Sequence, residues 1–194
     1  MAVWSMVGYI LGLGDRHGEN ILFDAKNGEC VHVDFSCLFE KGLALAQPEV
    51  VPFRLTPNMV DVLGVTGVEG AFREVSEVTM KLLREKQDLV MTNLETFLHD
   101  PLVEWNSKRG GGGSSGGGAA AAGNNRRPLE ATHLLGRVKA KLNGQGGTVR
   151  DAMLGVVTSS ELPLTVSGQV HRLIADATAV EKLAGMYVWW MAWF

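Results

Sequence analysis

A run of glycine, serine and alanine at 110–123 most constrains how this chain can fold. The run, GGGGSSGGGAAAAG, holds 8 of the 24 glycines in the 194 residues. It cannot bury enough apolar surface to offset the conformational entropy lost on ordering. We therefore predict a packed domain at 1–107, a flexible linker at 108–127 of natural or artificial origin, a helical connector at 128–161, and a second compact unit at 162–194.

Composition and charge exclude several classes of protein. The chain is 46% hydrophobic with a net charge of −3, which is typical of a globular protein and argues against direct, non-specific DNA binding. Two cysteines, Cys30 and Cys37, are too few for a secreted disulfide scaffold and indicate reduced thiols in a nuclear or cytosolic setting. The apolar start, Met1–Leu13, is too short to span a membrane and lacks the features of a signal peptide. We expect a buried helix there and no transmembrane segment.

The first domain contains a predicted β-hairpin at 21–34. Two short apolar runs, Ile21–Asp24 and Cys30–Asp34, flank the pair Asn27-Gly28. Asn-Gly favours a type I′ turn because both residues tolerate a positive φ.

Helices are predicted to follow the hairpin. Thr56-Pro57 is a typical helix start, with Thr as N-cap and Pro at the first helical position. Gln87–His99 forms a further predicted helix before Pro101. Between them, apolar or neutral residues at helical spacing predict an amphipathic helix with a buried stripe of Val68, Phe72, Val75, Thr79 and Leu82. The pattern indicates an α+β fold that is mostly helical.

The residues best suited to chemistry are Gly14–Asn20 and Asp34. Phosphoryl transfer needs a carboxylate to accept the substrate hydroxyl proton and oxygen ligands to hold a metal ion against the phosphates. Asp15 and Asn20 are five residues apart, as in a kinase catalytic loop, and the hairpin returns the chain so that Asp34 faces Asn20. We predict Asp15 as general base, and Asn20 and Asp34 as ligands of Mg²⁺ or Mn²⁺. His17 could donate a hydrogen bond to the γ-phosphate.

Neighbouring residues have plainer interpretations. Arg16 pairs with either the activation segment or a structural carboxylate. His32 alternates with Asp34 along a strand, which favours a packed residue over a catalytic one. Cys30, His32 and Cys37 give only three ligands without a known zinc spacing, so core cysteines are the better interpretation.

These motifs resemble the phosphatidylinositol 3-kinase-related protein kinases. The resemblance is carried by GDRHGEN at 14–20, VHVDF at 31–35, PEVVPFRLT at 48–56 and HDPLVEW at 99–105. In that family the catalytic loop has the order Asp-Arg-His. The last 33 residues resemble its C-terminal FATC motif. DFSCLFEKG and FLHDPLVEW are most similar to the branch of replication-stress checkpoint kinases.

The resemblance implies a fold, an activity and partners. The fold would be a kinase C-lobe, made of a catalytic hairpin plus helices, with a small helical FATC segment. The activity would be transfer of phosphate from ATP, bound at Asn20 and Asp34, to Ser/Thr-Gln sites of protein substrates in DNA-damage signalling. The kinase would work in the nucleus with an adaptor subunit and would reach DNA only through it. The activation segment would include Phe35, Ser36, Pro52, Phe53 and Arg54.

A lipid kinase is the runner-up, but the charge of the activation loop disfavours it. Lipid-kinase relatives hold an anionic headgroup with basic residues in this loop. Here 35–47 contains only Glu40 and Lys41, a net charge of zero.

The chain begins about a dozen residues before Asp15, so we expect the N-lobe of the kinase to be missing from it. Phosphotransfer also requires a phosphate-covering loop, a lysine on the third strand and a glutamate on a helix. We therefore expect residues 1–194 alone to be inactive. The alternative is a truncated, non-catalytic interaction fragment.

The aromatic C-terminal end, MYVWWMAWF, has three possible roles: a wedge under the lobe, a partner-docking patch or a membrane-interface anchor. The resemblance favours packing near the activation segment. Trp189 replaces a usual Gly and Ala192 a usual Pro, and both departures change the backbone preferences of the local turn. Ser36 replaces the Gly of the usual Asp-Phe-Gly, a departure shared with the checkpoint branch.

Overall fold

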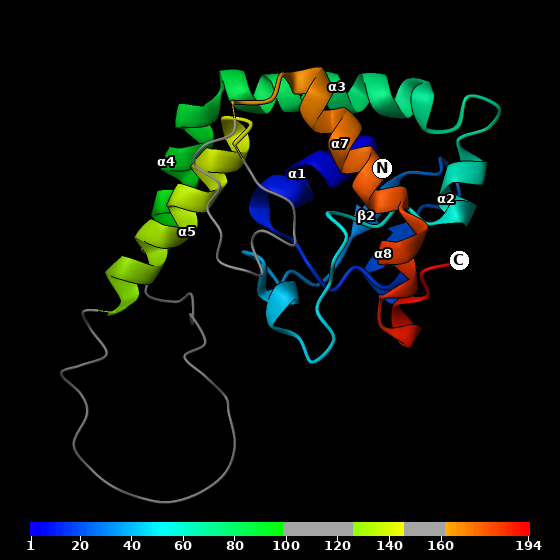
Figure 1. Ribbon diagram of the computed structural model, residues 1–194, viewed down its shortest axis with the longest axis horizontal. Coiled ribbons are helices and arrows are strands. Elements are labelled where there is room, and N and C mark those ends of the chain that lie inside the picture. Colours follow the sequence, from blue (N-terminus) through cyan, green and yellow to red (C-terminus); the bar gives the residue numbers. More distant parts are fainter. Residues whose placement is uncertain (99–125, 146–161) are drawn as a thin grey trace, which may run out of the picture.

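The computed structural model describes residues 1–98, 126–145 and 162–194. Residues 108–125 of the predicted linker and 146–161 of the predicted connector lie outside these ranges, whereas 126–142 form a helix. Figure 1 shows a mostly helical molecule with one small sheet, which confirms the α+β class. The helices are α1 (Ala2–Leu11), α2 (Pro57–Val62), α3 (Ala71–Glu85), α4 (Gln87–Leu98), α5 (Arg126–Leu142), α7 (Val166–Thr178) and α8 (Val180–Ala184). The strands are β1 (Ile21–Phe23) and β2 (Cys30–His32).

The apolar start of the chain forms α1, as predicted, and buries Met6, Tyr9 and Ile10. The helix ends at Gly12, which has a φ of 63°. A β-carbon at Gly12 would lie 2.6 Å from the main-chain nitrogen of Glu40. Glycine therefore both stops the helix and lets the segment after the hairpin lie directly against it.

The hairpin forms as predicted, but its turn is different. Strands β1 and β2 pair antiparallel, with Leu22 opposite Val31. Of the Asn-Gly pair only Gly28 has a positive φ, so the type I′ prediction is wrong. Instead, the side chains of Asp24 and Asn27 accept hydrogen bonds from the main-chain N–H two residues further on, at 2.7 and 2.9 Å. These local bonds widen the turn to the six residues 24–29.

The helices after the hairpin also form, with one error in the predicted buried face. α4 confirms the predicted helix within the described residues, and Thr56 is the N-cap of α2, although its hydroxyl makes no capping bond. On α3 the buried residues are Phe72, Ser76 and Met80, while the predicted Val75 and Leu82 are 42% and 54% exposed. The buried stripe is set by the helices that α3 covers, α1 and α7.

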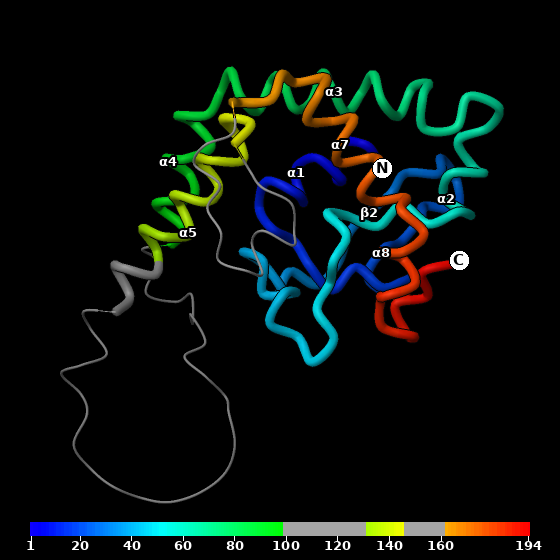
Figure 2. The backbone as a smooth tube through the Cα atoms, in the orientation of Figure 1, coloured from blue at the N-terminus to red at the C-terminus, as the bar shows by residue number. Residues whose placement is uncertain are grey.

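One main hydrophobic core includes both ends of the chain. It is formed by side chains of α1, α3, α5 and α7 together with Phe53 and Leu55. Sequence analysis predicts a separate compact unit at 162–194, but α7 contributes Val170, Leu173, Ile174 and Ala177 to this same core. Figure 2 shows α3 crossing the molecule beside both α1 and α7.

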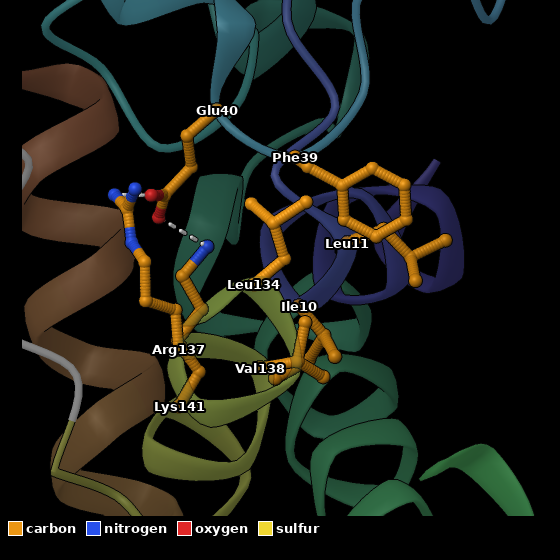
Figure 3. A pocket seen from close by; sticks show the side chains of 8 residues that line it. All are labelled: Ile10, Leu11, Phe39, Glu40, Leu134, Arg137, Val138 and Lys141. Carbon is orange, nitrogen blue, oxygen red and sulfur yellow. Dashed lines mark ion pairs between the residues drawn. The ribbon is translucent and has the colours of Figure 1, made fainter. Parts of the chain in front are cut away.

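A cluster of three charged side chains, which we call the α5 clasp, joins this core to the segment after the hairpin. It consists of Glu40, Arg137 and Lys141, and Figure 3 shows both basic side chains of α5 reaching the Glu40 carboxylate. Lys141 Nζ lies 2.7 Å from Glu40 Oε1 and also donates to the carbonyl of Tyr9. The clasp therefore fixes the start of the predicted activation segment against α1 and α5.

In the described part of the chain, no helix is long and apolar enough to cross a membrane.

Candidate active site

The main chain of Asp15 is held on both sides. Asp15 has a φ of 59°, in the left-handed region that non-glycine residues rarely adopt. Its N–H donates to Glu49 Oε2 at 2.7 Å, and its carbonyl accepts from Asn20 Nδ2 at 2.7 Å. Asp15 and Asn20, predicted as base and metal ligand, are therefore in direct contact.

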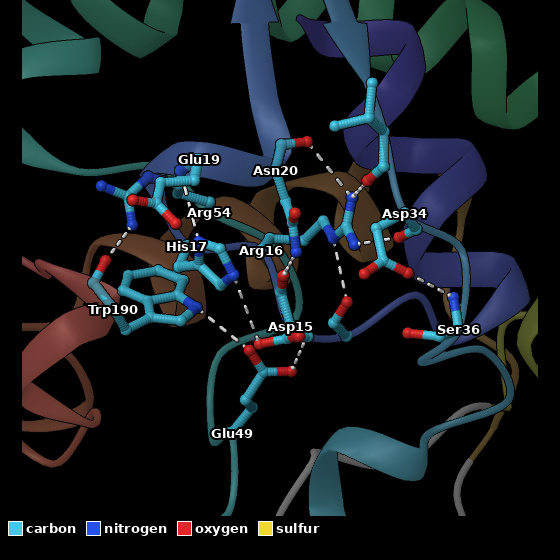
Figure 4. A network of polar contacts seen from close by, with 12 residues as sticks. Asp15, Arg16, His17, Glu19, Asn20, Asp34, Ser36, Glu49, Arg54 and Trp190 are labelled. Atoms are coloured by element: carbon cyan, nitrogen blue, oxygen red, sulfur yellow. Dashed lines mark hydrogen bonds and ion pairs between the residues drawn. The ribbon is translucent and has the colours of Figure 1, made fainter.

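Arg16 joins the catalytic loop, residues 14–20, to the end of the hairpin. Its buried guanidinium donates to the carbonyls of Gly14 and Val33 at 2.9 and 2.8 Å, and also to the carbonyl of Asp34 (Figure 4). Burial lowers the pKa of this guanidinium, with nearby carboxylates acting in the opposite direction. Its hydrogen-bond partners are main-chain carbonyls and not carboxylates, and one of them belongs to Asp34, directly before the predicted activation-segment residue Phe35. Its function is to hold Asp34 beside the loop.

His17 has a defined orientation. Its Nδ1 accepts the N–H of Glu19 at 3.2 Å, so in the neutral ring the proton is on Nε2. Nε2 lies 4.0 Å from Asp15 Oδ1, and the two side chains are 28% and 42% exposed. The ring thus presents an N–H beside the predicted base, where it can reach an incoming oxygen.

Asp34 presents an exposed carboxylate near the loop. Its Oδ1 accepts the N–H of Ser36 at 2.9 Å, and the hydrogen bonds from Ser36 lower the pKa of Asp34. Serine in place of glycine therefore supports the ionised state of this side chain. Next to it, His32 stacks on Trp4 with ring centroids 4.8 Å apart, and burial lowers the pKa of His32 to about 4. His32 is a packed strand residue, as predicted.

The side chains present fit a magnesium or manganese ion that is shared with phosphates. Because Asn20 Nδ2 is used by Asp15, its Oδ1 is the atom left for a cation, and Asp34 adds an ionised carboxylate. Within the described residues no group of three His, Cys, Asp or Glu side chains converges to hold a metal. One carboxylate and one amide oxygen, completed by phosphate and water, match how Mg²⁺ is bound in kinases.

The predicted activation-segment residues are divided between surface and interior. Phe35 and Ser36 are exposed and Pro52 is half-buried. Phe53 packs in the main core, and Arg54 is buried against the C-terminal tail, residues 185–194. Phe53 and Arg54, which were predicted to belong to the activation segment, therefore have their side chains in the interior.

Arg54 holds the tail through its main chain. It donates to the carbonyls of Trp190, Met191 (3.0 Å) and Phe194 (2.8 Å), and its guanidinium lies 4.5 Å from the centroid of the Trp190 ring. Trp190 packs with Val51 in a small second core that also contains Ala192. The predicted packing role is confirmed for Trp190, whereas Tyr187, Trp189, Trp193 and Phe194 are exposed.

Glu49 is the site residue that sequence analysis missed. Its two oxygens bind Asp15 N–H and Trp190 Nε1, at 2.7 and 3.0 Å (Figure 4). Burial raises the pKa of Glu49, and the hydrogen bonds from Asp15 and Trp190 oppose that shift. The sequence signals were its place in the motif PEVVPFRLT at 48–56 and its position directly before the apolar run at 50–53.

Two family profiles cover the two ends of the chain. The profile described as phosphatidylinositol 3- and 4-kinase matches residues 1–107, which include every predicted catalytic and metal-binding residue. The chain belongs to the phosphatidylinositol 3- and 4-kinase family. The FATC domain profile matches residues 163–194 of this family member. Membership implies ATP and a divalent metal ion.

Individual relatives are similar over the whole chain. The chain is 51% identical to the serine/threonine-protein kinase ATR of Arabidopsis thaliana over 193 residues, covering 100% of this chain and 6% of the relative. It is 48% identical to protein kinase rad3 of Schizosaccharomyces pombe, covering 100% and 7%. Among solved structures, the FAT and kinase domain of CtTel1 is 37% identical with a TM-score of 0.70, covering 100% and 12%. The chain thus spans only a small part of the proteins it resembles.

Proposed function

We propose that this chain contributes the catalytic loop and metal-binding residues of an ATR-type serine/threonine protein kinase. The observation that carries the proposal is the contact between Asp15 and Asn20, with Asp34 held beside them by Arg16. The proposed reaction transfers the γ-phosphate of ATP to the hydroxyl of a Ser/Thr-Gln site in a protein. The proposed setting is DNA-damage and replication-stress signalling in the nucleus, with an adaptor subunit through which DNA is reached.

The geometry supports one proposed role for each residue. Asp15 accepts the proton of the substrate hydroxyl as its oxygen bonds to phosphorus and ADP leaves. Asn20 Oδ1 and the Asp34 carboxylate would hold the metal ion, which neutralises charge on the phosphates when bound. His17 Nε2–H steadies the negative charge that develops beside Asp15.

A protein substrate is favoured over a lipid. The segment at 35–47 has one acidic residue, Glu40, and one basic residue, Lys41, and therefore no net charge. The relatives at about half identity are named protein kinases. A net neutral loop gives no cationic surface for an inositol headgroup.

The proposal is tested by phosphate incorporation with the full-length protein as cells make it. Wild type should phosphorylate a Ser-Gln peptide and leave phosphatidylinositol vesicles unmodified. Asp15→Ala and Asp34→Ala should each lower turnover by about 10² to 10⁴, the range for a positioned base or a charge-stabilising group. Asp61→Ala, an exposed carboxylate on α2, is the matched control and should keep wild-type turnover. Activity within a few-fold of wild type in both variants would show that other carboxylates do the chemistry.

A further inference from the structure

The Glu49 carboxylate connects two parts of the chain that are distant in sequence. One oxygen accepts the main-chain N–H of Asp15, 34 residues away, and the other accepts the indole N–H of Trp190, 141 residues away. Figure 4 shows Glu49 between the catalytic loop and the tail, with a bond to each. Hydrogen bonds to a carboxylate are stronger than those between neutral groups, so this connection is more than a surface contact.

Asp15 needs support of this kind because its backbone is strained. A left-handed φ costs a non-glycine residue about 1–2 kcal/mol and persists only where the surroundings hold it. Glu49 holds the N–H of Asp15 and Asn20 holds its carbonyl. Without the bond from Glu49, the peptide before Asp15 keeps only the bond from Arg16 to the carbonyl of Gly14, and we expect its orientation, and with it the direction of the Asp15 carboxylate, to be held less firmly.

Two glycines, Gly14 and Gly42, lie directly against the Glu49 carboxylate. A β-carbon at Gly14 would come within 2.5 Å of Glu49 Oε2, and one at Gly42 would overlap the same oxygen. Gly42 also accepts the main-chain N–H of Glu49 at 3.1 Å. The carboxylate is therefore fixed by its own main chain and by the absence of side chains around it.

The indole at the other end is fixed as well. Trp190 is 3% exposed and packs with Val51, Leu183 and Met186, while Arg54 binds the carbonyl of Trp190. The donor to Glu49 is thus in place only when the tail is docked.

We propose that Glu49 is a positioning residue for phosphoryl transfer, which transmits the docking of the C-terminal tail to the main chain of Asp15. This inference rests on the proposed kinase function. Tail docking orients the Glu49 carboxylate, and Glu49 in turn holds Asp15 in the conformation that accepts the substrate proton. Both oxygens of Glu49 already accept N–H groups of the protein, so its loss should affect turnover more than substrate binding.

Trp190→Phe is the direct test, since it removes the indole N–H and keeps an aromatic ring in the small core. In the full-length protein, it should lower kcat on a Ser-Gln peptide by about 10-fold to 100-fold, as expected for a misplaced catalytic group, with KM for ATP within two-fold. Hydrogen–deuterium exchange at the amide of Asp15 should increase. Trp189→Phe makes the same change at an exposed tryptophan and should match wild type in both measurements.

Gly42→Ala is a second test, because the added β-carbon displaces the Glu49 carboxylate directly and changes no residue of the tail. Gly42 does not have a positive φ, so alanine strains no backbone and acts only by displacing Glu49. It should reproduce the loss of kcat, and combined with Trp190→Phe it should cost no more than the larger single effect. Gly136→Ala, whose β-carbon meets nothing within 4 Å, is the control.

The outcomes separate this inference from the proposed function. If Trp190→Phe and Gly42→Ala keep the kcat and the Asp15 exchange of their controls, or if their effects add, Glu49 does not couple the tail to Asp15. If wild type fails to phosphorylate any Ser-Gln peptide, the kinase proposal is wrong, and exchange at Asp15 still decides whether the coupling exists.

Discussion

Glu40 and Glu49 lie nine residues apart in one segment, and they hold different parts of the molecule by different means. Glu40 binds two cations, Arg137 and Lys141, and so attaches the segment to α5. Glu49 binds two uncharged N–H groups and so connects the catalytic loop to the tail. An ion pair tolerates changes of angle and distance, whereas a carboxylate shared between two N–H donors requires exact placement.

This difference indicates what each carboxylate is for. Removing Glu40 leaves the Arg137 guanidinium and the largely buried Lys141 amine, whose pKa burial lowers to about 7, without their carboxylate partner, which is a cost in stability. Removing the contacts of Glu49 leaves a strained Asp15 backbone, which is a cost in catalysis. The α5 clasp should therefore respond mainly in local stability, and the Glu49 site mainly in turnover.

The largest expected effect on stability is at Arg54, which binds the same C-terminal tail that Glu49 contacts. Arg54→Met keeps the aliphatic stem and removes the donors to three tail carbonyls. Because the buried main-chain oxygen of Trp190 and the part-buried oxygens of Met191 and Phe194 lose their donor, the free energy of local opening of 186–194 should fall by about 3–4 kcal/mol. Hydrogen–deuterium exchange of tail peptides measures this, with the exposed Lys81→Met as control. Unchanged protection would mean that the tail is held by its apolar contacts alone.

The clasp gives the next largest effect. Glu40→Gln should lower the free energy of local opening at 38–42 and 137–142 by about 2–3 kcal/mol, since Arg137 and Lys141 then repel each other without a counter-charge. Turnover should change by less than three-fold. Glu85→Gln, at an exposed pair 4.0 Å apart, should leave protection of these peptides unchanged. A large loss of kcat with normal protection would reverse the roles assigned to the two glutamates.

The parts of the site that sequence analysis predicted are those fixed by local order along the chain. Asp15 and Asn20 are five residues apart in one loop, and the hairpin returns Asp34 to the same place because its strands pair within 14 residues. The α3 face was partly missed because that helix carries apolar residues on two overlapping stripes, one through Phe72 and Met80 and another through Val75 and Leu82. Only contact with α1 and α7 selects between them.

The contacts of Glu49 and Arg54 with the tail could not be predicted from the sequence. Their partners in the tail are more than 130 residues away, so no spacing rule joins them. A polar residue beside an apolar run, such as Arg54 after Phe53, indicates an ordinary surface position until a buried partner is known. The roles of both residues were therefore set by tertiary packing.

The smallest expected effect is a dependence of the Glu49 contact on pH. Burial raises the pKa of Glu49 above its usual value, so the docked state binds more protons than the opened state between the two pKa values. The free energy of opening at Asp15 should therefore be highest below the ordinary glutamate pKa of about 4.3 and fall as pH rises through the docked-state pKa.

Exchange rates at the Asp15 amide, corrected for the intrinsic effect of pH, measure this slope. Glu49→Gln should remove it, since a glutamine does not titrate, whereas Glu40→Gln should preserve it because Glu40 lies outside this contact. A slope of the opposite sign in wild type would show that the ionised form is favoured by docking, and that the N–H donors of Asp15 and Trp190 outweigh burial.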